Sequence, residues 1–216
     1  MKAKLQVALD MVSREKGCEL ATLLQDEVDI LEVGTPLVIR YGLGIVKEIR
    51  KVITTEREIL ADIKIADAGR WESEQAFAQG ATMVSVLAGA SFQTLEEVKS
   101  VCEKEKGKMV VDLIDWAICD RDKIQIIQRI QPDYLALHLS TDAVKKGDSL
   151  LQLRQRFPFL SETNFPFMLA GGVNRELLPS LLQEVRPQVV VVGSAVAGSP
   201  SPLAEVKEIR RIINLA

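Results

Sequence analysis

The sequence Val189-Val190-Val191-Val192-Gly193 is an apolar run with no polar alternation. Such a run is typical of a parallel strand that is covered on both faces. Seven further short apolar runs precede it, and each is followed by a longer segment with charged residues at helical spacing. This alternation predicts eight strand–helix units. The expected strands are Leu5–Leu9, Val28–Val33, Ile59–Ile65, Thr82–Leu87, Lys108–Ile114, Tyr134–His138, Phe165–Ala170 and Val189–Gly193.

The spacing of these strands favours a closed barrel. Successive strands begin 23 to 31 residues apart, which is about the length of one strand, one helix and two short loops. Eight such units in 216 residues predict a single α/β domain, a (β/α)8 TIM barrel over residues 1–216. A doubly wound open sheet is the alternative. Against it, the first strand leads into Leu9-Asp10-Met11-Val12 and not into a glycine-rich dinucleotide-binding turn.

Composition narrows the possible partners. The chain has 27 Lys plus Arg against 30 Asp plus Glu, and it lacks the concentrated basic face of a nucleic-acid-binding protein. No apolar run approaches the roughly 20 residues of a membrane helix, and Met1-Lys2 leads into a strand-like segment and not into a signal peptide. We therefore expect a cytoplasmic protein that binds neither nucleic acid nor membrane.

The cysteines and the histidine limit the metal chemistry. Cys18, Cys102 and Cys119 are odd in number and widely separated, so they predict neither a disulfide framework nor a zinc site. His138 is the one histidine, which excludes sites built on two or more imidazoles. Any metal must be held mainly by oxygen.

Polar residues and glycines gather where the expected strands end. In a parallel barrel the active site lies at the carboxyl ends of the strands, so this sorting predicts a site there. The residues at these ends are Asp10, Glu32, Asp62, Lys64, Asp112, His138, Gly171, Gly172, Gly193 and Ser194.

The segment 61–69, Ala-Asp-Ile-Lys-Ile-Ala-Asp-Ala-Gly, is the strongest local signal. Asp62 and Lys64 lie two apart on a strand and therefore share a face, here the barrel interior. Opposite charges on an interior face should be paired, although an ordinary salt-bridged strand end is the alternative for this pair alone. Asp67 lies beyond the strand, in the loop. It can reach a neighbouring site or a subunit interface only from there.

The other strand-end groups suggest a metal, a proton carrier and substrate contacts. Glu32 and Asp62 offer carboxylate oxygens that suit Mg²⁺, while a solvated acid at the barrel mouth is the alternative for Glu32. Asp10 and Asp112 are candidates for orienting Lys64 or binding substrate hydroxyls, with a helix N-cap as the alternative. His138 is the natural proton shuttle of the chain, with a structural role as the alternative.

Two glycine-containing turns predict a phosphate site. Gly171-Gly172 follows the seventh expected strand and Gly193-Ser194 follows the eighth. Loops 7 and 8 of such barrels frequently bind phosphate through backbone N–H groups, whereas tight turns alone are the alternative. The predicted substrate class is a sugar phosphate.

Over its whole length the sequence resembles the orotidine-monophosphate-decarboxylase superfamily, and within it the hexulose-6-phosphate synthase and 3-keto-gulonate-6-phosphate decarboxylase group. The segments that carry the resemblance are 5–10 (Leu-Gln-Val-Ala-Leu-Asp), 32–36 (Glu-Val-Gly-Thr-Pro), the Asp62-x-Lys64-x-x-Asp67-Ala68-Gly69 pattern, 170–172 (Ala-Gly-Gly) and 192–194 (Val-Gly-Ser). The resemblance implies that Glu32 and Asp62 hold Mg²⁺ and that Lys64 stabilises an enediolate oxyanion. It also implies a homodimer in which Asp67 enters the partner subunit's site.

Neighbouring residues favour the synthase within this group. Asp112 and Ala170 stand where the decarboxylases carry glutamate and threonine, Thr141 replaces an arginine, and 34–36 (Gly-Thr-Pro) has the synthase form. The segment 138–142, His-Leu-Ser-Thr-Asp, departs from the His-Thr-Gly pattern of the synthases. We therefore expect an aldolase that joins formaldehyde to ribulose 5-phosphate. The alternatives are 3-keto-L-gulonate 6-phosphate decarboxylation and a sugar-phosphate-binding barrel without turnover. Orotidine-monophosphate decarboxylation is a weaker alternative, because it needs no metal and gives Glu32 no evident role.

Overall fold

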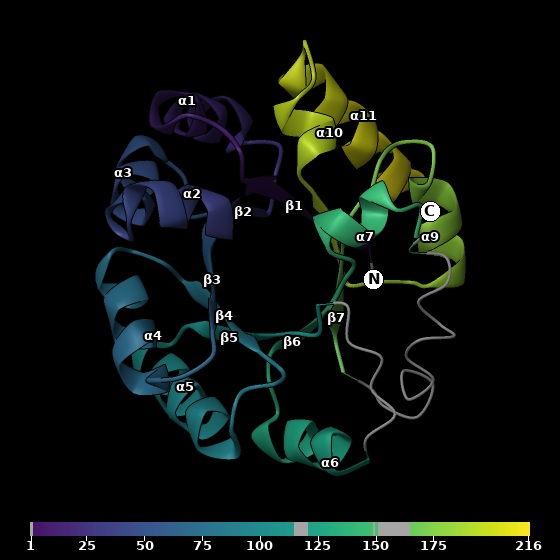
Figure 1. Cartoon of the computed structure of the whole chain (residues 1–216). Helices are drawn as coiled ribbons and strands as arrows, with labels where there is room; N and C mark the ends of the chain where they lie inside the picture. The colour runs from purple at the N-terminus through teal and green to yellow at the C-terminus, as the bar shows by residue number, and fades with distance from the viewer. Residues whose placement is uncertain (1, 115–120, 149, 151–164) are drawn as a thin grey trace.

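The computed structural model describes residues 2–114, 121–148, 150 and 165–216, in which eight parallel strands close into a barrel (Figure 1). Each strand pairs with the next along the chain, and Lys4 of the first strand pairs with Val189 of the last. This closure confirms the predicted (β/α)8 barrel and excludes the open sheet. The strands are β1 (Lys4–Leu9), β2 (Ile30–Val33), β3 (Glu58–Ile65), β4 (Met83–Leu87), β5 (Lys108–Asp112), β6 (Tyr134–His138), β7 (Phe167–Ala170) and β8 (Val189–Val192).

All eight expected strands are present, with small differences at their ends. β2 begins at Ile30 and not at Val28, because the Asp29 carboxylate accepts the Leu5 N–H and takes the place of a strand carbonyl. β7 begins at Phe167, since Pro166 has no N–H to give to the ladder. β5 ends at Asp112, two residues before the predicted end.

Helices surround the barrel (Figure 1). Serine side chains cap three of them, because Ser13, Ser91 and Ser140 each accept a backbone N–H of the first helical turn. No helix in the described ranges is long and apolar enough to cross a membrane. The described helices are α1 (Arg14–Leu24), α2 (Thr35–Tyr41), α3 (Gly44–Val52), α4 (Gly69–Ala78), α5 (Phe92–Glu105), α6 (Arg121–Ile130), α7 (Thr141–Lys145), α9 (Leu178–Glu184), α10 (Ser194–Ala197) and α11 (Pro202–Leu215).

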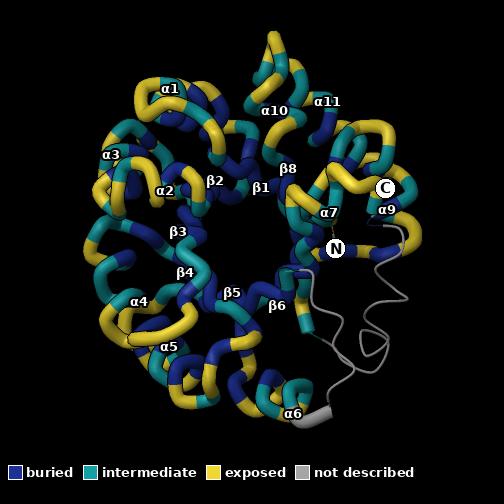
Figure 2. Tube along the Cα trace, viewed as in Figure 1, coloured by how far each residue is buried: buried dark blue, intermediate teal, exposed yellow. Residues whose placement is uncertain are grey.

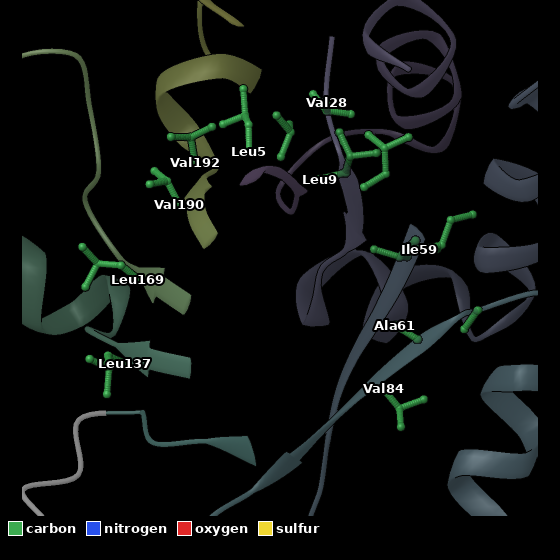
Figure 3. Close-up of a cluster of buried hydrophobic side chains, with 14 of the residues drawn as sticks. Leu5, Leu9, Val28, Ile59, Ala61, Val84, Leu137, Leu169, Val190 and Val192 are labelled. Carbon is green, nitrogen blue, oxygen red and sulfur yellow. The ribbon is translucent and has the colours of Figure 1, made fainter. Parts of the chain in front are cut away.

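Two apolar layers line the two faces of the barrel wall. Strand residues such as Leu5, Ile59 and Val190 belong to the larger cluster, which includes buried helix residues (Figure 3). Ile30, Leu60 and other alternate strand residues form a smaller cluster inside the barrel. The wall is therefore buried on both faces, and exposed residues lie mainly on the outer helices and loops (Figure 2).

Inside the barrel, five consecutive strands change from apolar to polar as they approach their carboxyl ends. Alternate strand residues share a face, so each polar residue lies above the apolar one that precedes it by two positions. The pairs are Ile30 and Glu32, Leu60 and Asp62, Met83 and Ser85, Val110 and Asp112, and Ala136 and His138. The apolar cluster thus forms the floor of a polar site.

Candidate active site

A cavity of about 670 Å³ lies at the carboxyl ends of the strands. It contains every strand-end residue that the sequence singled out, while Asp67 does not line it. Its predicted lining residues are Asp10, Glu32, Asp62, Lys64, Asp112, His138, Gly171, Gly172, Gly193 and Ser194. The tertiary structure therefore brings together groups from strands that are distant in sequence.

Lys64 lies between two carboxylates. Its Nζ is 2.7 Å from Asp62 Oδ2 and 3.0 Å from Asp112 Oδ2. Burial alone would lower the pKa of Lys64, but the charges and hydrogen bonds of Asp62 and Asp112 raise it above its ordinary value. Lys64 is thus a fixed cation, held by its strand neighbour and by an acid from β5.

Asp112 connects Lys64 to His138. The Nδ1 atom of His138 lies 3.2 Å from the same Asp112 Oδ2 that Lys64 contacts. Burial would raise the pKa of Asp112, yet His138 and Lys64 together hold it below its ordinary value. An ionised carboxylate only accepts hydrogen bonds, so Nδ1 of His138 is the donor in this contact and Nε2 is left free of Asp112.

Asp10, Glu32 and Asp62 lie at the carboxyl ends of the neighbouring strands β1, β2 and β3 and form the acidic side of the site. Burial, followed by the charges of Asp62 and Asp10, raises the pKa of Glu32 well above its ordinary value. Burial and Asp62 likewise raise the pKa of Asp10. Gln6 Nε2 donates to Glu32 Oε2 at 2.6 Å. The Thr35 hydroxyl donates to Asp62, with Oγ1 2.6 Å from the Asp62 carbonyl oxygen and 2.9 Å from Oδ2. The N-cap of α1 is Ser13, so the N-cap alternative for Asp10 is wrong.

This acidic side has the oxygen chemistry of a hard divalent cation. Carboxylates that raise one another's pKa are stabilised when a cation lies between them. Among the described residues, no group of three or more His, Cys, Asp or Glu side chains is arranged to hold a metal ion. The donor set therefore fits Mg²⁺ only with one or two protein carboxylates and further oxygens from water or substrate, as Mg²⁺ usually has.

Glycine is required at the turn after β7. Gly171 has a φ of +101°, and a Cβ there would lie 2.0 Å from the Leu139 carbonyl oxygen. Gly172 also has a positive φ of +70°. The turn after β8 places Gly193 next to the Asp10 carboxylate and begins α10 at Ser194. Both turns bring main chain to the cavity wall.

Asp67 is exposed on the loop after β3, and its Oδ1 accepts the N–H of Ala68 at 2.7 Å. It does not line the cavity of its own chain. Cys18 is half-buried and Cys102 is buried, both as free thiols, whereas Cys119 lies outside the described residues.

Three polar residues that hold the carboxylates of the site were not predicted from the sequence: Gln6, Thr35 and Ser85. All three line the cavity and donate a hydrogen bond to Glu32 or Asp62. They were missed because none is ionisable. Alternation along β1 and β4 was the available signal, since Gln6 and Ser85 are buried polar residues on otherwise apolar strands.

Comparison with known protein families shows which family this chain belongs to. Residues 3–209 match the model of the orotidine 5'-phosphate decarboxylase / HUMPS family. This chain belongs to that family. A 3-hexulose-6-phosphate synthase of Mycobacterium gastri is 33% identical over 211 residues, which cover 97% of this chain and 99% of that protein. The 3-hexulose-6-phosphate synthase 2 of Staphylococcus saprophyticus is 32% identical, with coverage of 98% and 97%.

Solved structures of the family share this barrel. The 3-hexulose-6-phosphate synthase of Salmonella typhimurium superposes with a TM-score of 0.89 at 29% identity, over 98% of this chain and 99% of that one. The 3-keto-L-gulonate-6-phosphate decarboxylase of Vibrio cholerae has a TM-score of 0.82 at 24% identity, over 100% and 99% of the two chains. The second likeness shows the common fold.

Proposed function

We propose that this protein is a Mg²⁺-dependent lyase of the aldolase type, which condenses formaldehyde with ribulose 5-phosphate to give arabino-3-hexulose 6-phosphate. The observation that supports it best is the arrangement of Lys64 and His138 on the two sides of Asp112 Oδ2. The synthase names of relatives at about 30% identity support the choice of substrate.

Glu32 and Asp62 are the residues that would hold Mg²⁺. When bound, this ion supplies Lewis-acid polarisation of a carbonyl and so acidifies the neighbouring C–H. Gln6 orients the Glu32 carboxylate by a hydrogen bond, and Thr35 holds Asp62 through contacts with its carbonyl oxygen and its carboxylate. The apolar cluster beneath them closes the barrel interior below the site.

His138 is the proton carrier of the proposed reaction. Its Nε2 takes the C1 proton of ribulose 5-phosphate, while Asp112 holds the Nδ1 proton and stabilises the imidazolium that forms. Lys64 lies beside Asp112 and offers its positive charge to the oxyanion of the 1,2-enediolate. The enediolate carbon then attacks the formaldehyde carbon. The formaldehyde C=O bond becomes an alkoxide that takes back the proton held by His138, so the new C–C bond forms with no other product.

The phosphate of the substrate binds at the turns after β7 and β8. Backbone N–H groups of Gly171, Gly172, Gly193 and Ser194 are the proposed donors, by the general preference of such loops for phosphate. The carboxylate pair and the glycine turns line the same cavity. One sugar phosphate therefore spans from the acidic side to the turns.

The active unit in this proposal is a homodimer with shared sites. Asp67 is exposed and outside its own cavity, and two large apolar side chains, Ile39 on α2 and Trp71 on α4, are 80% and 64% exposed. Burying such residues against a second copy is favourable, and it would bring Asp67 to the partner's site. Analytical ultracentrifugation of the native protein and of Trp71→Asp tests this, with a dimer expected only for the native chain.

Decarboxylation of 3-keto-L-gulonate 6-phosphate to L-xylulose 5-phosphate and CO2 is the second candidate. The observation that favours it is that the same Lys64, Asp112 and His138 geometry serves an enediolate formed by loss of CO2. In that reaction His138 returns a proton to carbon and does not first remove one.

The deciding experiment incubates purified protein and Mg²⁺ with ribulose 5-phosphate and formaldehyde, and follows formaldehyde loss with an EDTA control. Metal-dependent consumption supports the aldolase. No consumption, together with CO2 release from 3-keto-L-gulonate 6-phosphate, favours the decarboxylase. A folded protein that binds ribulose 5-phosphate and turns over neither substrate is a binding barrel without catalysis.

A further inference from the structure

The pairing of β3 with β4 shifts register in the stretch that contains Asp62 and Lys64, the two charged residues of β3 in the site. Ala61 pairs with Val84, but Ile65 pairs with Val86, so β3 advances four residues while β4 advances two. Within this irregular stretch, Lys64 has a φ of +49°. A left-handed conformation is uncommon for a residue with a side chain and persists only where the surroundings hold it.

Ser85 is the β4 residue that meets this irregularity. Its Oγ accepts the Lys64 N–H at 2.9 Å and donates to Asp62 Oδ1 at 2.7 Å. A serine hydroxyl has one proton to donate and lone pairs to accept, so both contacts are satisfied at once. The side chain is 2% exposed, which keeps water from competing for either partner.

These contacts close a ring of interactions. Asp62 Oδ1 also lies 2.9 Å from Lys64 Nζ. The Ser85 hydroxyl therefore joins the main chain of Lys64 to the carboxylate that holds its ammonium group. The direction of the Lys64 side chain depends on its unusual backbone conformation. The Ser85 hydroxyl therefore influences this direction twice, through the Lys64 backbone and through the Asp62 carboxylate.

We propose that Ser85 is a positioning residue that fixes the left-handed backbone of Lys64 and the orientation of Asp62. The effect on turnover rests on the proposed function, in which Lys64 stabilises the oxyanion. Without the hydroxyl, the Lys64 backbone and the Asp62 carboxylate each lose a hydrogen bond, so Lys64 Nζ is held less precisely although Asp112 still contacts it. Preorganised charge is what lowers the barrier. In the proposed function the phosphate binds at the turns after β7 and β8, away from Ser85, so substrate affinity should change little.

The variants that test this are Ser85→Ala, Ser85→Thr and Ser73→Ala. Ser73 is a matched control, because it is also fully buried and its Oγ donates to the Gly69 carbonyl at 2.6 Å in α4, outside the cavity. We expect kcat to fall about 10- to 100-fold in Ser85→Ala, with KM changed by less than about threefold. Threonine keeps a hydroxyl and should restore most of kcat, whereas Ser73→Ala should turn over like the native protein.

A second readout does not depend on turnover. Hydrogen exchange of the Lys64 amide, measured relative to the Leu60 amide of the same strand, should speed up about tenfold or more in Ser85→Ala and stay unchanged in Ser73→Ala. This ratio separates a local release of Lys64 from general destabilisation, which accelerates both amides.

Unchanged relative exchange at Lys64 in Ser85→Ala overturns the proposal, as does an equal loss of kcat in Ser73→Ala. If the native protein turns over neither substrate, but Ser85→Ala alone releases the Lys64 amide, the proposed function fails and the positioning role of Ser85 stands.

Discussion

His138 Nδ1 lies 3.2 Å from Asp112 Oδ2, the oxygen that also lies 3.0 Å from Lys64 Nζ. The three residues come from β6, β5 and β3. One buried carboxylate thus holds both the proposed proton carrier and the proposed oxyanion stabiliser. Its loss should affect both roles together.

Replacing Asp112 with asparagine should lower kcat about 100-fold or more, because an uncharged amide neither stabilises the imidazolium nor fixes the His138 tautomer. Steady-state kinetics of the favoured reaction measures this. Asp142→Asn is the control, since the Asp142 side chain is 91% exposed on α7. An Asp112→Asn enzyme with native kcat would contradict the shared role.

Lys64→Met should abolish most turnover, with a loss of about 100-fold or more from removal of the charge at the oxyanion. Borohydride added with substrate should leave the mass of the native protein unchanged, because the raised pKa keeps Lys64 protonated and not nucleophilic. Intact-mass spectrometry is the measurement. A reduced adduct on the peptide that contains Lys64 would show a Schiff base and refute this assignment.

Adding Mg²⁺ should stabilise the folded protein, by about 2.7 kcal/mol at 100 times the dissociation constant. Glu32→Gln should remove this gain in a thermal melt, since it replaces one of the two proposed ligands. Glu19→Gln is the control on the exposed face of α1. If Mg²⁺ stabilises Glu32→Gln as much as it stabilises the native chain, the metal binds elsewhere.

Glu58 should make stability depend on pH in the acid range. Burial alone would raise its pKa, but hydrogen bonds from Lys108 and Lys4 lower it below its ordinary value. Because the unfolded chain then binds the proton more readily, the stabilisation is complete above the unfolded pKa and is lost as pH falls through the folded value.

The corresponding variant is Glu58→Gln. We expect its free energy of unfolding at neutral pH to be lower by about 1 kcal/mol or less, because the group is partly exposed. The difference from the native chain should shrink as pH falls through the lowered pKa of Glu58, because the carboxyl is then protonated in both states. Urea unfolding across this range measures it, and a difference that grows on acidification would reverse the sign of the argument.

Gly34 should be required for the position of Asp10. A Cβ on Gly34 would lie 1.8 Å from Asp10 Oδ1, so the carboxylate must turn away in Gly34→Ala. A displaced group in a site of this kind costs about tenfold or more in turnover. Gly89→Ala is the matched control, because no atom lies within 4 Å of its Cβ position. Equal kcat in the two variants would show that Asp10 has no role.

Local sequence patterns were enough to predict the strands, their order along the chain and the strand-end position of the charged residues. Alternation and spacing are local properties, so β8 and the positions of Asp62 and Lys64 at the end of a strand follow from neighbouring residues alone. The first residues of β2 and β7 could not be predicted in this way, because the Asp29 carboxylate and Pro166 change the hydrogen bonding between strands there.

Which of these groups meet was set by the closed barrel and not by any local pattern. Asp112 contacts both Lys64 and His138 because closure of the barrel and its register bring three strand ends together. The register slip beside Ser85 and the left-handed Lys64 arise from pairing between β3 and β4, two strands that are separate in the sequence. The two-residue period of a strand determines which face each side chain lies on. Which residues of the neighbouring strands that side chain contacts depends on the register that packing selects.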